Sequence, residues 1–297
     1  NADLQVKYAD LSVRGFPSRF DTRISDITLT DRPSGIIWRA PFFDIYALSY
    51  KPYHIIASLP HEQSLRLPDQ VLQIGSDEIK GSVIFEPKPL IEPALIIDRS
   101  SFVLRNLVVK SSKAWESTIE SGHFAIRQTP ANPQHYDLAV SLQNVTLPDT
   151  LRDVIDPARQ QPALFDSLKL DSTLALTDRW NLLDSGKRAT AISEIAIKDF
   201  LVIWNDLRFQ AEGTLQIDKS GQPEGRLNLT ATNWQKMYQL AEKADAINPD
   251  FAQTIQNGLK VLAGMSEGED VIEIPLVFSG GQMSLGPFPI GPSPRLH

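Results

Sequence analysis

The sequence contains no cysteine. This absence excludes disulfide bonds, thiolate metal ligands and a cysteine nucleophile, and it also excludes the lipidated cysteine that anchors a bacterial lipoprotein. The sequence also has no run of about eighteen apolar residues, which is the length that a membrane-spanning helix requires. These 297 residues therefore carry neither of the two commonest membrane anchors.

Basic residues are in the minority. The chain has 29 Lys and Arg against 36 Asp and Glu, which gives a net charge of -7. This charge repels a phosphate backbone on average, so we expect no nucleic-acid partner. The hydrophobic fraction of 42% and the charged fraction of 22% are ordinary for a folded protein and argue against disorder.

The sequence motifs of common enzymes are absent as well. The five histidines share no HExxH or HxH spacing, and we find no GxSxG, no GxGxxG after a strand and no GxxxxGK(S/T). Those motifs supply metal ligands, a strained nucleophile or a glycine-lined phosphate site. We therefore expect a protein that is not an enzyme and that holds no metal and no cofactor.

The clearest pattern that is present lies between Leu207 and Asp218. Apolar and polar residues alternate there, with Gly213 as the one interruption at the apolar positions. A period of two predicts a strand with one buried face. The alternation returns over residues 226–232, after the turn segment 219–223, so the two segments are predicted to form an antiparallel hairpin.

A second pattern recurs along the chain. An acid or amide residue lies between apolar positions at Asp26, Asn144 and Glu194, and a looser copy surrounds Asn106. The inward-facing parity of the strand changes at these residues, and a β-bulge is the simplest explanation. The recurrence indicates a structural repeat and hence two related halves.

Three helices are predicted among the strands. Residues 149–155 begin with an acidic residue and carry a short apolar stripe. Asn233 is the candidate N-cap of a second helix, and a third helix begins at Pro249 and ends before Gly264. The apolar stripes of the last two helices need a partner, and the apolar face of the preceding hairpin is the nearest one.

These elements predict a mainly β (α+β) fold. We expect curved antiparallel sheets in two related halves, with a few helices packed on the C-terminal sheet. The N-terminal half would span residues 1–156 and the C-terminal half residues 157–297, or the chain would form one continuous elongated unit.

Several short segments resemble a known family. These segments are Gly15-Phe-Pro-Ser-Arg-Phe20, Gly35-Ile-Ile-Trp-Arg-Ala-Pro41, Ala47-Leu-Ser-Tyr50 with Pro52 and His54, and the closing Gly-Gly-x-Met-x-Leu-Gly. With them the chain resembles, over most of its length, an uncharacterised family of alphaproteobacterial envelope proteins grouped as domain of unknown function 2125. The hairpin, the last two helices and the final strand pair also resemble the C-terminal part of AsmA-like proteins, whose larger relatives form lipid-conducting β-grooves.

This resemblance implies a periplasmic protein tethered to the inner membrane by an N-terminal segment that is missing from this chain. The first residue, Asn1, is not a methionine, which fits a processed or trimmed N terminus. The resemblance implies no catalytic residues.

Two groups of apolar residues are candidates for a lipid groove. One is an aromatic group in the N-terminal half, and the other lies on the predicted hairpin and the final strand. Both kinds of residue also fill protein cores, and aromatic clusters do so more often than they bind ligands. The candidates are Trp38, Phe43, Tyr46, Tyr50, Leu215, Ile217, Leu227, Leu229, Ile274 and Leu276.

Three functions are compatible with the sequence. The first is a non-enzymatic envelope protein that holds a lipid or acyl chain in an apolar β-groove. The second is a structural or assembly scaffold that binds envelope proteins through its sheet, for example at a strand edge. The third is a hydrolase whose two carboxylates come from distant strands. An unfilled apolar cavity would favour the first function over the second.

Overall fold

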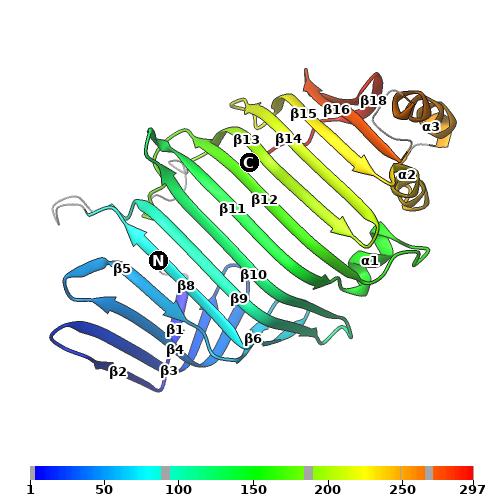
Figure 1. The fold of residues 1–297 in the computed structure, drawn as a ribbon. Coiled ribbons are helices and arrows are strands. Elements are labelled where there is room, and N and C mark those ends of the chain that lie inside the picture. The colour runs from blue at the N-terminus through cyan, green and yellow to red at the C-terminus, as the bar shows by residue number, and fades with distance from the viewer. Residues whose placement is uncertain (1–3, 88–93, 184–189, 248, 265–269, 297) are drawn as a thin grey trace. The chain divides into compact units, whose positions relative to one another are not determined.

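The structure is a computed structural model that describes residues 4–87, 94–183, 190–247, 249–264 and 270–296 (Figure 1). It confirms the mainly β fold, since strands dominate and every strand pairing described is antiparallel. The chain divides into two compact units. The first consists of Asn1–Arg127, Leu142–Asp149 and Asn181–Leu183, and the second of Gln128–Ser141, Thr150–Trp180 and Asp184–His297.

The first unit is a sheet built from long and short strands. The strands are β1 (Leu4–Lys7), β2 (Asp10–Arg14), β3 (Arg19–Asp31), β4 (Ile36–Leu48), β5 (Lys51–Ser58), β6 (Glu62–Arg66), β7 (Val71–Gly75), β8 (Glu78–Phe85), β9 (Ile97–Ser111) and most of β10 (Glu116–Thr129).

In this sheet, pairs of short strands share the edges of long ones. β1 and β2 both pair with β3, and β3 pairs with β4. β5 and β6 both pair with β4, while β7 and β8 both pair with β9. β9 then pairs with β10. The polar hollow discussed below lies on β3, β4, β6 and β7.

Single residues in a left-handed conformation interrupt these strands. Asp26, Asn106 and Asn144 have φ angles of 50°, 47° and 50°, which confirms irregular backbone at the recurring acid or amide. Glu194 pairs with Ala175, and the register of β12 with β13 shifts between Ala175 and Leu176.

The bulge interpretation is wrong for Asp26. The pairing of β3 with β4 keeps the same register on both sides of this residue, from Ser25↔Phe42 to Ile27↔Ala40. A bulge would insert an extra residue and shift that register. Asp26 is therefore a kink within a continuous register, opposite Pro41, which has no N–H to donate.

The second unit contains strands and all three predicted helices. Its elements are part of β11 (Asn132–Thr146), most of α1 (Asp149–Ile155), β12 (Leu164–Leu176), β13 (Ile192–Trp204), β14 (Leu207–Ile217), β15 (Pro223–Thr232), α2 (Trp234–Lys243), α3 (Pro249–Ala263), β16 (Val271–Ser279), β17 (Gln282–Leu285) and β18 (Phe288–Pro292).

The predicted hairpin is confirmed as β14 and β15. The two strands pair without a register shift from Arg208↔Thr232 to Ile217↔Pro223. Gly213 lies opposite Leu227 with a φ of 141°, at the interruption of the alternating pattern. A side chain there would overlap the carbonyl oxygen of Arg226, so the glycine is required by the close approach of the neighbouring backbone.

Cross-strand register gives the second unit one apolar sheet face. The pairings Leu168↔Val202, Val202↔Phe209, Phe209↔Ala231 and Ala231↔Ile272 form one apolar row across five strands. The next row repeats this character. It contains Leu170, Phe200, Ala211, Leu229 and Ile274.

The last two helices cover one end of this apolar face. Trp234 and Tyr238 of α2 and Leu259 of α3 form a buried cluster with Ile272 and Ile274 of β16. Figure 1 shows α2 and α3 together beside β15 and β16. Within the described ranges, no helix is long and apolar enough to cross a membrane.

The hairpin geometry yields a stability prediction. Gly213→Ala should lower the free energy of unfolding by about 3 kcal/mol, because the new Cβ meets both a disfavoured φ and the backbone of β15. Gly280→Ala is the matched control, since Gly280 has a φ of 59° but open space around it, and it should cost about 1 kcal/mol. Urea unfolding measures both variants, and equal losses would contradict the backbone-clash argument.

Candidate functional site

The four aromatic candidates of the first unit are not gathered in one groove. Trp38 and Phe43 pack edge to face with ring centroids 6.0 Å apart, and the Trp38 indole N–H donates to Gln63 Oε1 at 2.8 Å. Tyr46 is 37% exposed and Tyr50 is 68% exposed. Their role in lipid binding stays a prediction.

Tyr46 belongs to a polar cluster around a buried carboxylate. Asp44 is 5% exposed and accepts two hydrogen bonds from the Arg23 guanidinium, from Nε at 2.7 Å and from Nη2 at 2.6 Å. The Tyr46 hydroxyl donates to Asp44 Oδ2 at 3.3 Å, and the Arg23 guanidinium lies 4.5 Å from the centre of the Phe42 ring. The cluster joins β3 to β4 by a fork-shaped ion pair, which is the strongest geometry for such a pair.

The hydrogen bonds from Arg23 lower the pKa of the Asp44 carboxyl, and burial opposes this shift only in part. Burial raises the pKa of the Tyr46 hydroxyl, and the nearby Asp44 charge adds to the effect. Asp44 is thus held ionised and fully engaged, which is the state of a structural ion pair rather than of a proton donor.

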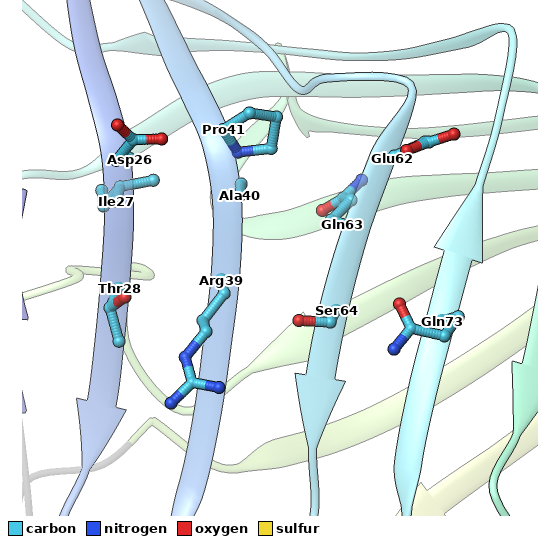
Figure 2. A pocket seen from close by; sticks show the side chains of 10 residues that line it. All are labelled: Asp26, Ile27, Thr28, Arg39, Ala40, Pro41, Glu62, Gln63, Ser64 and Gln73. Atoms are coloured by element: carbon cyan, nitrogen blue, oxygen red, sulfur yellow. The ribbon is translucent and has the colours of Figure 1, made fainter.

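A polar hollow of about 470 Å³ lies on the sheet of the first unit (Figure 2). Its floor is a row of hydrogen-bonding side chains placed by register, Thr28↔Arg39, Arg39↔Ser64 and Ser64↔Gln73. Arg39 is exposed and has no ion-pair partner among the residues described. The lining consists of Asp26, Ile27, Thr28, Arg39, Ala40, Pro41, Glu62, Gln63, Ser64 and Gln73.

This polar hollow is suited to hydrogen bonding rather than to acid–base chemistry. Its two carboxylates, Asp26 and Glu62, come from β3 and β6, which are separated by β4. Both side chains are exposed, whereas a catalytic general acid is usually held in apolar surroundings. The hydrolase hypothesis therefore finds two carboxylates here but not the burial that would make one of them an acid.

One serine–histidine contact joins two paired strands of the first unit. His54 Nε2 and Ser82 Oγ lie 2.9 Å apart on the paired strands β5 and β8. A nucleophilic serine also needs a group that orients the histidine, and no hydrogen bond to His54 Nδ1 is found in the part of the chain described. A cross-strand hydrogen bond explains this pair. Among those same residues, no group of three or more His, Asp or Glu could hold a metal ion.

The six candidates of the second unit lie in two packed clusters. Leu215, Ile217 and Leu227 are buried with Phe278, and Leu229 and Leu276 pack against them. Ile274 belongs to the neighbouring cluster beneath α2 and α3. The structure therefore places four of the six in buried positions and leaves Leu229 and Leu276 partly buried, and their role as a ligand groove stays a prediction.

An apolar cavity of about 400 Å³, open to solvent on one side, lies beside these clusters, between α1, α2 and the adjoining ends of β13 and β14. None of the ten groove candidates lines it. All of its lining residues are apolar, and Val154, which is 63% exposed, marks its opening to solvent. The lining consists of Val154, Ile155, Val202, Trp204, Leu207, Phe209, Met237, Leu240, Ala241, Ala244 and Ala246.

The cavity wall is held by specific contacts. Trp204 stacks on Phe165 with ring centroids 4.2 Å apart, and its indole N–H donates to the carbonyl of Pro162 at 2.8 Å. Asp156 is fully buried, and its carboxylate accepts hydrogen bonds from the backbone N–H groups of Gln160 and Gln161 at 2.9 and 2.8 Å. The Asp156 bonds order the loop after α1, and the Trp204 bond joins that loop to β13. Specific contacts therefore fix the position of this wall of the cavity.

Helix α2 is also fixed where it begins. Asn233 is at the predicted cap position, but its side chain does not cap the helix. It adopts a φ of 58°, and its amide donates to the carbonyl of Asp206 at 2.5 Å. Lys236 forms an ion pair with the Asp206 carboxylate. The turn between β13 and β14 therefore holds α2 over the cavity.

Sequence reasoning missed most of the cavity because its residues come from four separated segments. Leu207 and Phe209 belong to the predicted hairpin, and Met237 and Ala241 to the predicted stripe of α2. The alternation of β14 and the helical period of α2 show that these residues face inward. Neither pattern shows that α1 and α2 leave a space between them.

The comparisons with known proteins give one match. The family model described as "Uncharacterized protein conserved in bacteria (DUF2125)" matches residues 2–294. No curated protein and no solved structure matches the chain. The resemblance to AsmA-like proteins stays a prediction.

The Asp44 cluster yields a prediction with a pH dependence. Asp44→Asn should lower the free energy of unfolding by about 1–2 kcal/mol at pH 7, a modest loss because Arg23 is half exposed to solvent. The folded-state pKa of Asp44 is lowered, so the ion pair stabilises the protein above the unfolded pKa of about 3.9 and is lost as the pH falls below it. The difference in free energy of unfolding between wild type and Asp44→Asn should therefore shrink between pH 5 and pH 2, by roughly its whole value at pH 7.

Urea unfolding at several pH values tests this prediction. Asp10→Asn is the control, because Asp10 is exposed and has no ion-pair partner among the residues that the structure describes. A loss in Asp44→Asn that equals the control, or that persists unchanged at low pH, would show that the pair contributes nothing.

Proposed function

The chain belongs to the bacterial family described as "Uncharacterized protein conserved in bacteria (DUF2125)", and we propose that it is a non-enzymatic binding protein that holds an acyl chain in the cavity of its second unit. The observation that carries this proposal is the lining of that cavity, which consists of apolar residues alone. An apolar lining gives water no hydrogen-bond partners, so such a site favours an apolar ligand.

The size and surroundings of the cavity fit a long, narrow apolar ligand. A volume of about 400 Å³ lies in the range of small-molecule sites. The apolar row of the sheet continues from Val202 and Phe209 of the cavity to Leu168, which is half buried. An acyl chain that enters beside Val154 could therefore extend over the apolar sheet face, and the lining offers no charge that would favour a polar ligand.

The cellular setting belongs to the same proposal. We infer from the family resemblance that the protein acts in the periplasm and is attached to the inner membrane by a segment outside this chain. An acyl-chain site would be useful there, because lipids and their precursors must cross an aqueous space between membranes. An envelope protein as a further partner is compatible with this setting.

A protein-binding scaffold is the second candidate, and one observation favours it. The edge formed by β1 and β2 has exposed apolar side chains, with Leu11 at 47% and Val13 at 52% exposure. Such an edge can accept a strand from another protein through backbone hydrogen bonds. A scaffold does not need an empty cavity, so the occupancy of the cavity separates the two functions.

Filling the cavity tests the proposal. Ala241→Phe should place a ring among Met237, Leu240 and Phe209, and binding of a dansyl-labelled fatty acid should weaken by at least about tenfold. Gln239→Phe is the matched control, because Gln239 lies on the same helix, is exposed and does not line the cavity. The control should bind the fatty acid as wild type does, and both variants should keep a cooperative thermal transition.

Native mass spectrometry of the purified wild type complements the titration by detecting lipid that co-purifies. If wild type shows neither saturable fatty-acid binding nor co-purifying lipid, the scaffold becomes the better function. Equal loss of binding in both variants would show that the probe binds elsewhere.

A further inference from the structure

Two large aromatic side chains are strongly exposed at one end of the first unit. Phe16 is 79% exposed in the turn between β2 and β3, and Tyr50 is 68% exposed in the turn between β4 and β5. Among the residues described, these are the two most exposed large apolar side chains. Neither turn needs such a residue for its geometry, so the exposed rings indicate a surface that contacts a partner.

The two turns form one surface. The backbone N–H of Ser49 donates to the carbonyl of Ser18 at 3.1 Å, and Arg19 pairs with Leu48 directly below the turns. Phe20 extends the aromatic surface, with its ring centroid 6.4 Å from that of Phe16. Figure 1 shows the β2–β3 and β4–β5 turns at the same end of this sheet. We call residues 14–20 and 47–53 the hairpin tip.

The charges of the hairpin tip have one sign. Its fourteen residues include Arg14, Arg19 and Lys51 and no Asp or Glu. Arg19 pairs with Asp21 at 2.9 Å, and Asp21 also lies opposite Arg14 in the register of β2 with β3. Arg14 and Lys51 are exposed and form no ion pair in the described part of the chain. A cationic tip on a protein of net charge -7 is a local departure from the average. It is complementary to an anionic surface.

We propose that the hairpin tip docks on the surface of an anionic lipid bilayer. Exposed aromatic rings prefer the boundary between headgroups and acyl chains, where their apolar faces leave water. Lys and Arg beside them are attracted to anionic headgroups. A protein groove would also accept the rings, but the unpaired cations around them are better matched by a layer of phosphates. This docking surface is distinct from the cavity of the second unit and does not depend on its ligand.

Vesicle binding tests the proposal with defined lipids. Wild type should co-sediment with vesicles of phosphatidylglycerol and phosphatidylcholine and bind pure phosphatidylcholine vesicles far less. Arg14→Gln with Lys51→Gln should weaken binding to the anionic vesicles by about twenty-fivefold, at roughly fivefold for each cation. Phe16→Ala with Tyr50→Ala should weaken it by about tenfold. The binding of the first pair of variants should also lose most of its salt dependence.

Matched controls lie on the same unit. Tyr8 is 53% exposed but lies outside the tip, and Arg66 is an exposed cation near the opposite end of β4. Tyr8→Ala and Arg66→Gln should leave vesicle binding unchanged. The proposal is overturned if wild type binds both kinds of vesicle equally, if the tip variants bind as wild type does, or if the controls weaken binding as much.

Sedimentation velocity separates a bilayer from a protein partner. Wild type should be monomeric without vesicles. A wild-type dimer that Phe16→Ala with Tyr50→Ala dissociates would assign the tip to contacts between copies of this chain and overturn the proposal. Fatty-acid binding in the cavity should be the same in wild type and all tip variants, so that failure of this inference is distinguishable from failure of the proposed function.

Discussion

The need to cover one apolar sheet face is the constraint on which the second unit depends. Register places apolar residues in rows across β12 to β16, and such a face is stable only when another element removes it from water. Trp234, Tyr238 and Leu259 cover the rows at Ile272 and Ile274. At the β13 and β14 end, the covering elements are the short α1 and the last turns of α2, and they do not fill the space above Trp204 and Phe209. The cavity follows from how few helical residues cover a wide sheet.

In the first unit, the left-handed kinks decide which residues share a face. Trp38 and Phe43 are five residues apart, so a regular strand would place them on opposite faces, yet their rings are in contact. The parity of β4 therefore changes between them, opposite the kink at Asp26 on β3. Because both strands change parity together, the register survives and the aromatic residues stay on one side. The polar row of Thr28, Arg39, Ser64 and Gln73 occupies the other side.

The polar side chains of the first unit are held by hydrogen bonds or are exposed to solvent. Asp44 is fully engaged by Arg23, and Asp26 and Glu62 of the polar hollow are exposed. His54 contacts Ser82 as a cross-strand neighbour. Among the residues described, two features support the binding proposals. One is an apolar cavity with a hydrogen-bonded wall, and the other is a hairpin tip with exposed rings and unpaired cations. A protein that contacts lipid surfaces and holds an acyl chain would use both.

The sequence by itself determined the fold class, the β14–β15 hairpin, the three helices and the irregular backbone at Asp26 and Asn144, because each is a local consequence of alternation, helical period or a residue that tolerates positive φ. It identified Leu215, Leu227 and Ile274 as inward-facing for the same reason. Only the tertiary structure decided that these residues are packed in a core, and that the open space lies instead between Ile155, Trp204 and Ala244. A local pattern states which way a side chain points, whereas a cavity depends on how closely distant segments approach one another, and that distance is set by the packing of the whole unit.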